Sequence, residues 1–289
     1  MEIVIKFNAD AAATLTAQLI AARVRAKPDL VLGLATGRTM EAVYTKLAAL
    51  ELDFSRCRSF NLDEYIGVPP TDKHSYRCYM DERLFDKINI VKTNTHVPDG
   101  MASDLGAEVA RYELLIKEAR GIDLQLLGIG EDGHIGFNEP LSALMSRTRE
   151  KALTPATRRQ NAGMFGGDPD RVPKRALTMG VGTILEAREI VLLATGPDKA
   201  AILAKAVEGS ISAMISASAI QLHPRCKVVL DQDAAGALTQ RDYYDWVFQT
   251  SLNGKPIGDE ISCRLLVSPT GTQSVRGRKG RAECLLQIL

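Results

Sequence analysis

Hydrophobic and polar positions along the chain alternate between short apolar runs and longer segments with helical spacing. Apolar runs of about four to eight residues predict buried β-strands, whereas apolar residues that recur every three to four positions predict amphipathic helices. The predicted strands cover 3–7, 30–34, a segment that ends near Asn61, 122–128, 188–194 and 226–230. The longer segments between them cover 11–26, 40–50, 75–87, 104–119, 199–208 and 216–222.

This alternation of strands and helices is typical of βαβ units. Such units build an open, mainly parallel, doubly wound α/β sheet with helices on both faces. In open sheets of this kind, ligands bind beyond the carboxyl ends of the strands. The periodic pattern fades after Phe248, so we expect a single domain over 1–248 and an irregular or mobile tail over 249–289.

Composition and charge exclude several classes of protein. The chain is 45% hydrophobic and 25% charged, which is typical of a globular protein with a substantial core. A net charge of +1 provides no global field that favours nucleic acid or an anionic membrane. The five cysteines are scattered and form no CxxC pair, as expected for reduced thiols in the cytoplasm. With no apolar run near the roughly 20 residues of a membrane helix, we expect a cytoplasmic monomer or homo-oligomer.

Three unusual segments directly follow predicted strands, and the first is Leu32-Gly-Leu-Ala-Thr-Gly-Arg-Thr39. Its small residues allow a ligand close to the backbone, and the amides at the start of the next helix attract an anion. Thr36 and Thr39 add hydroxyl donors, and Arg38 can form a bidentate contact to phosphate. The segment lacks Walker A spacing. It predicts an anion site that includes Gly37, with a purely structural turn as the alternative.

The second segment, Phe60-Asn-Leu-Asp-Glu-Tyr65, places two carboxylates at the end of a strand. Asp63 and Glu64 are adjacent and cannot both face the core, so at least one of them points toward the crevice. A carboxylate held near a sugar carbon can act as the general base of an enolisation. The alternative interpretation is an acidic cap on the following loop.

The third segment runs from Leu127 to Pro140 and contains glycines at 128, 130 and 133, the formal G-x-G-x-x-G spacing. A dinucleotide site with this spacing requires a helix that opens at the third glycine. His134 follows instead, and Asn138-Glu139-Pro140 comes soon after, which is typical of a loop. The pattern therefore excludes a nucleotide site.

The same loop brings together Asp132, His134 and Glu139. Histidine exchanges protons near neutral pH, and flanking carboxylates orient its ring and tune its pKa. A structural histidine is the alternative. A metal site is a weaker alternative, because no second histidine or cysteine lies nearby to complete a ligand set.

Taken together, these segments resemble the glucosamine-6-phosphate deaminase family, over roughly residues 30 to 248. The resemblance continues in the same order through Ala176–Leu185, Gly196-Pro-Asp-Lys199, Ala206-Val-Glu-Gly209 and Leu222-His-Pro224.

The resemblance implies conversion of a small amino sugar phosphate to fructose 6-phosphate with release of ammonia, and no metal or organic cofactor. It implies that Asp63 moves the C2 proton toward C1. It also implies that His134 opens the sugar ring, oriented by Asp132 and Glu139. The phosphate would bind to the amides of 36–39 and to Lys199.

The chain departs from the family pattern at the phosphate end. Ala35, Arg38 and Met40 interrupt the usual Pro-Thr-Gly-Gly-Thr-Pro loop, and Gly163 stands where the family carries a phosphate-binding arginine. We therefore expect Arg38 to supply the missing cation from the opposite side of the pocket.

Three alternative functions differ in class or in substrate. A galactosamine-6-phosphate deaminase would use the same machinery and differ only in how it recognises the C4 hydroxyl. A 6-phosphogluconolactonase shares the fold but needs no enolising base, which the motif around Asp63 disfavours. A non-enzymatic sugar-phosphate sensor would have little reason to keep both a base and a ring-opening histidine.

Overall fold

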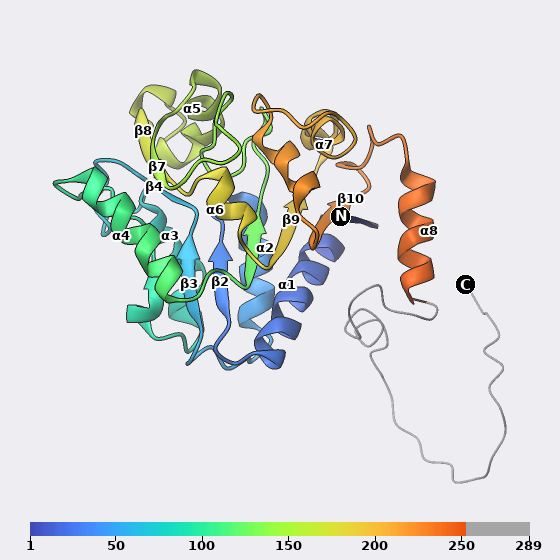
Figure 1. The fold of residues 1–289 in the computed structure, drawn as a ribbon, viewed down its shortest axis with the longest axis horizontal. Helices are drawn as coiled ribbons and strands as arrows, with labels where there is room; N and C mark the ends of the chain where they lie inside the picture. The colour runs from blue at the N-terminus through green and yellow to red at the C-terminus, as the bar shows by residue number, and fades with distance from the viewer. Residues whose placement is uncertain (253–289) are drawn as a thin grey trace, which may run out of the picture.

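The computed structural model describes residues 1–252 (Figure 1). Its central sheet has seven parallel strands in the order β1-β10-β9-β6-β2-β3-β5. The interior strands are buried along nearly their whole length, so helices and loops cover both faces. The strands are β1 (Glu2–Lys6), β2 (Val31–Leu34), β3 (Arg58–Asn61), β5 (Thr95–His96), β6 (Leu124–Leu127), β9 (Glu189–Ala194) and β10 (Cys226–Asp231).

Helices α1, α3, α4 and α5 begin at a side chain that caps the first turn. The side chain of Asn8 accepts a hydrogen bond of 2.8 Å from the backbone of Ala11 at the start of α1, and Asp104 caps α4 in the same way. The α-helices are α1 (Ala9–Ala26), α2 (Arg38–Ala48), α3 (Tyr76–Arg83), α4 (Leu105–Glu118), α5 (Pro155–Asn161), α6 (Val181–Leu185), α7 (Ala200–Val207) and α8 (Arg241–Leu252).

A second, three-stranded antiparallel sheet stands above the carboxyl ends of the main strands (Figure 1). It consists of β4 (Asp63–Tyr65), β8 (Arg175–Thr178) and β7 (Arg149–Ala152). A separate apolar cluster includes side chains of this sheet and is formed by Tyr65, Tyr76, Phe137, Leu153, Ala162, Phe165, Val172 and Ala176. The sequence pattern did not predict this sheet, because its strands have only three or four residues and carry charged side chains.

The mainly parallel α/β fold is confirmed, and each predicted main-sheet strand is present. The segment 216–222 forms a 3-10 helix, and the helix expected over 75–87 is α3 followed by a 3-10 turn at Phe85–Lys87. Helix α8 continues to Leu252, four residues past the expected domain boundary. The tail expected over 249–289 lies, from residue 253 onward, outside the described residues. Within the described part, no helix is long and apolar enough to cross a membrane.

Candidate active site

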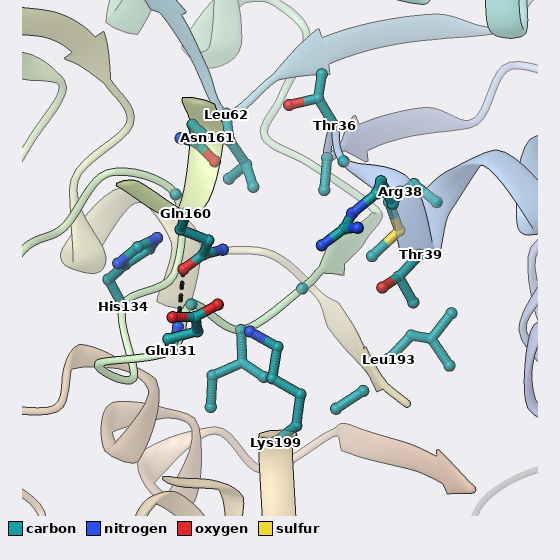
Figure 2. A pocket seen from close by; sticks show the side chains of 18 of the residues that line it. Thr36, Arg38, Thr39, Leu62, Glu131, His134, Gln160, Asn161, Leu193 and Lys199 are labelled. Carbon is teal, nitrogen blue, oxygen red and sulfur yellow. Dashed lines mark hydrogen bonds between the residues drawn. The ribbon is translucent and has the colours of Figure 1, made fainter. Parts of the chain in front are cut away.

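A cleft of about 480 Å³ opens at the carboxyl edge of the main sheet, beneath the small sheet (Figure 2). Its size falls within the range of small-molecule sites, roughly 300–1,000 Å³. Of the nine residues predicted for the site, Asp132 and Glu139 do not line the cleft but contact His134, which does. The others line it directly: Thr36, Gly37, Arg38, Thr39, Asp63, His134 and Lys199.

One end of the cleft is formed by the loop after β2 and the first turn of α2. Gly37 caps this helix with φ +118, a conformation that side chains other than glycine rarely adopt. Among the described residues no side chain caps the first turn, so the N–H groups of Arg38 and Thr39 can bind an anion, whereas the Met40 N–H donates to the Gly37 carbonyl over 2.9 Å. The Tyr79 hydroxyl donates a hydrogen bond of 2.8 Å to the Gly37 carbonyl and fixes the loop. Arg38 points into the cleft (Figure 2).

Lys199, the residue just before helix α7, lines the same cleft. Burial lowers the pKa of Lys199, the carboxylates of Glu131 and Asp198 oppose that shift, and the charge of Arg38 adds to it. Two cationic side chains that face one cleft beside an uncapped helix start favour an anionic ligand, because the ligand's charge relieves their repulsion.

The two adjacent carboxylates of β4 have separate roles. Glu64 accepts backbone hydrogen bonds from Tyr65 (2.8 Å), Tyr76 (3.0 Å) and Arg77 (3.0 Å), so it caps helix α3. Asp63 instead lines the cleft, where burial and then the charge of Glu64 raise its pKa to about 8. The expectation that one carboxylate faces the crevice is confirmed, and the capping interpretation holds for its neighbour.

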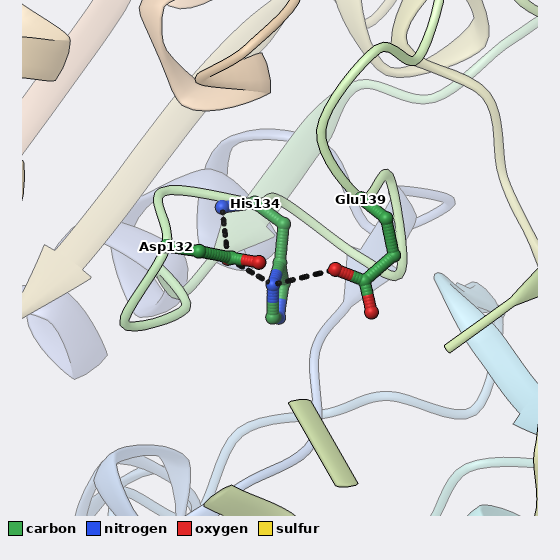
Figure 3. A group of neighbouring side chains, drawn as sticks. All are labelled: Asp132, His134 and Glu139. Carbon is green, nitrogen blue, oxygen red and sulfur yellow. Dashed lines mark hydrogen bonds and ion pairs between the residues drawn. The ribbon is translucent and has the colours of Figure 1, made fainter. Parts of the chain in front are cut away.

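His134 is held by two carboxylates on the loop after β6 (Figure 3). Its Nδ1 lies 2.5 Å from Oδ1 of Asp132 and 3.8 Å from Oε2 of Glu139. Burial raises the pKa of Asp132, but hydrogen bonds from His134 outweigh it and lower that pKa to about 2. Burial raises the pKa of Glu139, against opposing hydrogen bonds from Thr157 and Thr154.

The short contact with Asp132 selects the tautomer of the ring. Because Asp132 is ionised, Nδ1 of His134 carries the proton that is shared between them. In neutral imidazole one nitrogen donates and the other accepts, so Nε2 is left as the nitrogen that can take up a proton.

The glycines of the histidine loop allow its backbone to lie close to the side chains of His134 and Asp63. A Cβ atom at Gly130 would lie 2.3 Å from Cε1 of the His134 ring, and one at Gly136 would lie 3.4 Å from Oδ2 of Asp63. Turns, and no helix, follow Gly133. This geometry agrees with the exclusion of a dinucleotide site.

The donor atoms of Asp132, His134 and Glu139 all lie within 4.8 Å of one another, as ligands of a metal ion would. Two ligands of one tetrahedral zinc ion, however, stand about 3.3 Å apart. The 2.5 Å contact between His134 and Asp132 is the length of a charge-assisted hydrogen bond. The described arrangement is thus a carboxylate–histidine pair.

The cleft also contains residues that the sequence analysis did not predict: Tyr76, Glu131, Gln160, Asn161, Met164 and Asp198. Gln160 and Asn161 are the last two residues of α5, and both line the cleft. A signal for this helix was present, because Thr154 followed by Pro155 is a typical helix start. Nothing in the pattern indicated that its end would face the site.

An α/β fold with an anion site, a buried carboxylate and a paired histidine in one cleft defines an acid–base enzyme that acts on a small anionic substrate. The sequence profile of the glucosamine-6-phosphate isomerases/6-phosphogluconolactonase family matches residues 6–229. The chain belongs to this family.

Curated relatives match this chain over nearly the whole of their own length. A glucosamine-6-phosphate deaminase of Hahella chejuensis is 48% identical over 256 residues, which cover 87% of this chain and 97% of the relative. The deaminase of Shewanella loihica is 49% identical over 248 residues, which cover 84% of this chain and 92% of the relative.

Solved structures agree with the fold. The structure of a monomeric glucosamine-6-phosphate deaminase superposes with a TM-score of 0.80 at 41% identity, covering 82% of this chain and all of that chain. The 6-phosphogluconolactonase of Trypanosoma cruzi superposes with a TM-score of 0.67 at 19% identity, covering 82% of this chain and 97% of that chain, a likeness of fold alone.

Proposed function

We propose that this chain is a glucosamine-6-phosphate deaminase that acts in the cytoplasm. It converts glucosamine 6-phosphate and water to fructose 6-phosphate and ammonia. The observation that carries this proposal is the presence of Asp63 and His134 in one cleft whose far end has two cations and a free helix N-terminus. The similarity to deaminases along 84–87% of the chain supports the choice of substrate.

Ring opening is assigned to His134. Its free Nε2 removes the proton from the hydroxyl on C1 of the pyranose, and the imidazolium returns a proton to the ring oxygen as the C1–O5 bond breaks. Asp132 is ionised and bonded to Nδ1, so it stabilises the positive charge that the ring carries between these two transfers. Glu139 stands 3.8 Å from the same nitrogen and reinforces this orientation.

Isomerisation is assigned to Asp63, which takes the proton from C2 and returns it to C1. A proton also passes from the C2 ammonium to the C1 oxygen, which leaves a C1 hydroxyl and a C2 iminium. Water adds to this C2 iminium, and the C2–N bond breaks to release ammonia and form the ketone. A carboxyl with a pKa of about 8 is largely protonated at neutral pH in the empty cleft. The substrate carries an ammonium on C2, next to the proton that is removed, and that positive charge favours the ionised base. Binding of the correct amino sugar thus activates Asp63.

The phosphate is assigned to the other end of the cleft. There the amides of 37–39, the hydroxyls of Thr36 and Thr39, and the cations Arg38 and Lys199 provide the donors.

One set of assays tests this function. The protein is incubated separately with glucosamine 6-phosphate, galactosamine 6-phosphate and 6-phosphogluconolactone, and ammonia, ketose phosphate and lactone hydrolysis are measured. We expect ammonia and fructose 6-phosphate from the first substrate. Lactone hydrolysis without ammonia release would overturn the proposal, and faster turnover of the galacto substrate would reassign its sugar.

A second measurement separates the two catalytic roles. With fructose 6-phosphate, ammonium and deuterated water, Asp63→Asn should abolish exchange of the C1 proton. His134→Gln should retain part of this exchange, because the open-chain ketose needs no ring opening. Equal loss in both variants would contradict the division of roles.

A further inference from the structure

Gln160 lies in the last turn of helix α5 and lines the cleft, and one hydrogen bond fixes the direction of its amide. The backbone N–H of Glu131 donates to Oε1 of Gln160 over 3.0 Å (Figure 2). A backbone N–H can only donate, so the atom that faces it must be the amide oxygen. The NH₂ group of Gln160 is therefore directed away from Glu131 and into the cleft.

This NH₂ group faces the same space as the two cations of the anion site. In Figure 2 the side-chain nitrogens of Gln160, Arg38 and Lys199 point toward one another across the cleft, and all three residues line it. The nearby Gly163 provides no side chain, and a Cβ atom there would meet nothing within 4 Å. Donors from three different walls thus surround one site for an acceptor.

We infer that Gln160 is a phosphate-binding residue, whose Nε2 donates a hydrogen bond to a phosphoryl oxygen and whose orientation is set by the backbone of Glu131. The inference rests on the proposed function for the nature of the ligand, a phosphate ester. Two negative groups face the same region, the carboxylates of Glu131 and Asp198, and both lie near Lys199. A neutral donor adds affinity there without raising the repulsion between Arg38 and Lys199.

The competing explanation is that Gln160 only ties α5 to the histidine loop. That tie uses the amide oxygen alone, so the two explanations predict different results for two variants. Gln160→Glu keeps an oxygen for the Glu131 N–H but loses the donor toward the cleft. Gln160→Met keeps the length of the side chain and its neutrality but loses both groups.

A neighbouring residue provides the matched control for charge. Arg159→Gln changes the net charge by −1, as Gln160→Glu does, on an exposed residue of the same helix that does not line the cleft. Binding of inorganic phosphate is measured by calorimetry at fixed ionic strength for the full-length protein and its variants. Melting temperature, KM and kcat are recorded in parallel.

We expect Gln160→Glu to weaken phosphate binding by about tenfold or more, as loss of a hydrogen bond to a charged group predicts, with a melting temperature close to that of the wild type. Gln160→Met should weaken phosphate binding about fivefold or more, and Arg159→Gln should change it less than about twofold. Wild-type affinity in Gln160→Met, or an equal loss in Arg159→Gln, would overturn the inference. Because phosphate binding needs no turnover, a wild-type protein without deaminase activity would refute the proposed function and leave this test intact.

Discussion

The Nδ1 atom of His134 lies 2.5 Å from Oδ1 of Asp132, and the backbone N–H of His134 donates to the same oxygen over 3.2 Å. These two contacts fix both the ring and the carboxylate on a loop that contains flexible glycines. The contact with Asp132 also keeps the proton on Nδ1, which leaves Nε2 as the nitrogen that can accept a proton from a ligand.

Asp132→Asn tests the importance of this charge. The amide keeps the shape of the side chain but no longer stabilises a positive imidazolium, so kcat should fall by about 10²-fold or more, the usual contribution of an acid–base group. KM should change much less, because Asp132 does not line the cleft. Steady-state kinetics measure both, and a kcat within threefold of wild type would remove Asp132 from the mechanism.

The pH dependence of kcat/KM should reflect Asp63 in the free enzyme. Its pKa of about 8 means that the active carboxylate form increases as the pH rises toward that value. We therefore expect kcat/KM to rise with pH up to about 8, and kcat to have its acidic limb at lower pH because bound substrate favours the carboxylate. A kcat/KM that is flat from pH 5 to 8 would contradict this reading.

The stability of the fold should also depend on Asp63, but it should fall as the pH rises, whereas kcat/KM should increase. Between the ordinary aspartate pKa of 3.8 and the folded value of about 8, the native state holds a proton that the unfolded state has lost. The free energy of unfolding therefore decreases as the pH rises through this range. Asp63→Asn should be as stable as wild type near pH 4 and gain at least about 2 °C in melting temperature at pH 8.5. A difference that stays constant with pH would show that burial does not shift Asp63.

Two glycine substitutions separate local crowding from general backbone effects. Gly130→Ala places a Cβ atom 2.3 Å from the His134 ring, so the ring must move and activity should fall by about 10²-fold or more. Gly163→Ala meets open space and should keep full activity, with a stability change within about 1 kcal/mol. Activity and thermal melting of the two variants check this, and a fully active Gly130→Ala would mean that the position of the ring is not critical.

Arg38 should contribute mainly to phosphate binding. Arg38→Ala removes one charge-assisted hydrogen bond, which costs about 1.5–3 kcal/mol and should raise KM for the sugar phosphate at least tenfold. A smaller change in kcat is expected, because Arg38 lies at the end of the cleft away from His134 (Figure 2). An unchanged KM would leave the helix amides and Lys199 as the phosphate site.

The main sheet could be predicted from the sequence because its strands are buried on both faces and therefore appear as apolar runs, as Ile-Val-Leu-Leu-Ala does over 190–194. The small sheet could not, since Arg149–Ala152 is a strand only through its pairing with Arg175–Thr178. Asp63 and His134 were predicted from residue type and position after a strand. Gln160 was not, because only tertiary structure brings the end of α5 over the cleft.

The proposed base and the proposed ring-opening histidine stand on different sheets. Asp63 belongs to the short antiparallel sheet, and His134 follows a central strand of the parallel one. The two proposed chemical steps therefore rest on separate pieces of backbone, which touch where the Phe137 N–H of the histidine loop donates to Oγ1 of Thr178, the strand partner of Asp63, over 3.0 Å. Substitutions in the small sheet that keep this contact should alter proton transfer at carbon without moving His134, so the two proposed steps can be changed separately only where the contact is preserved.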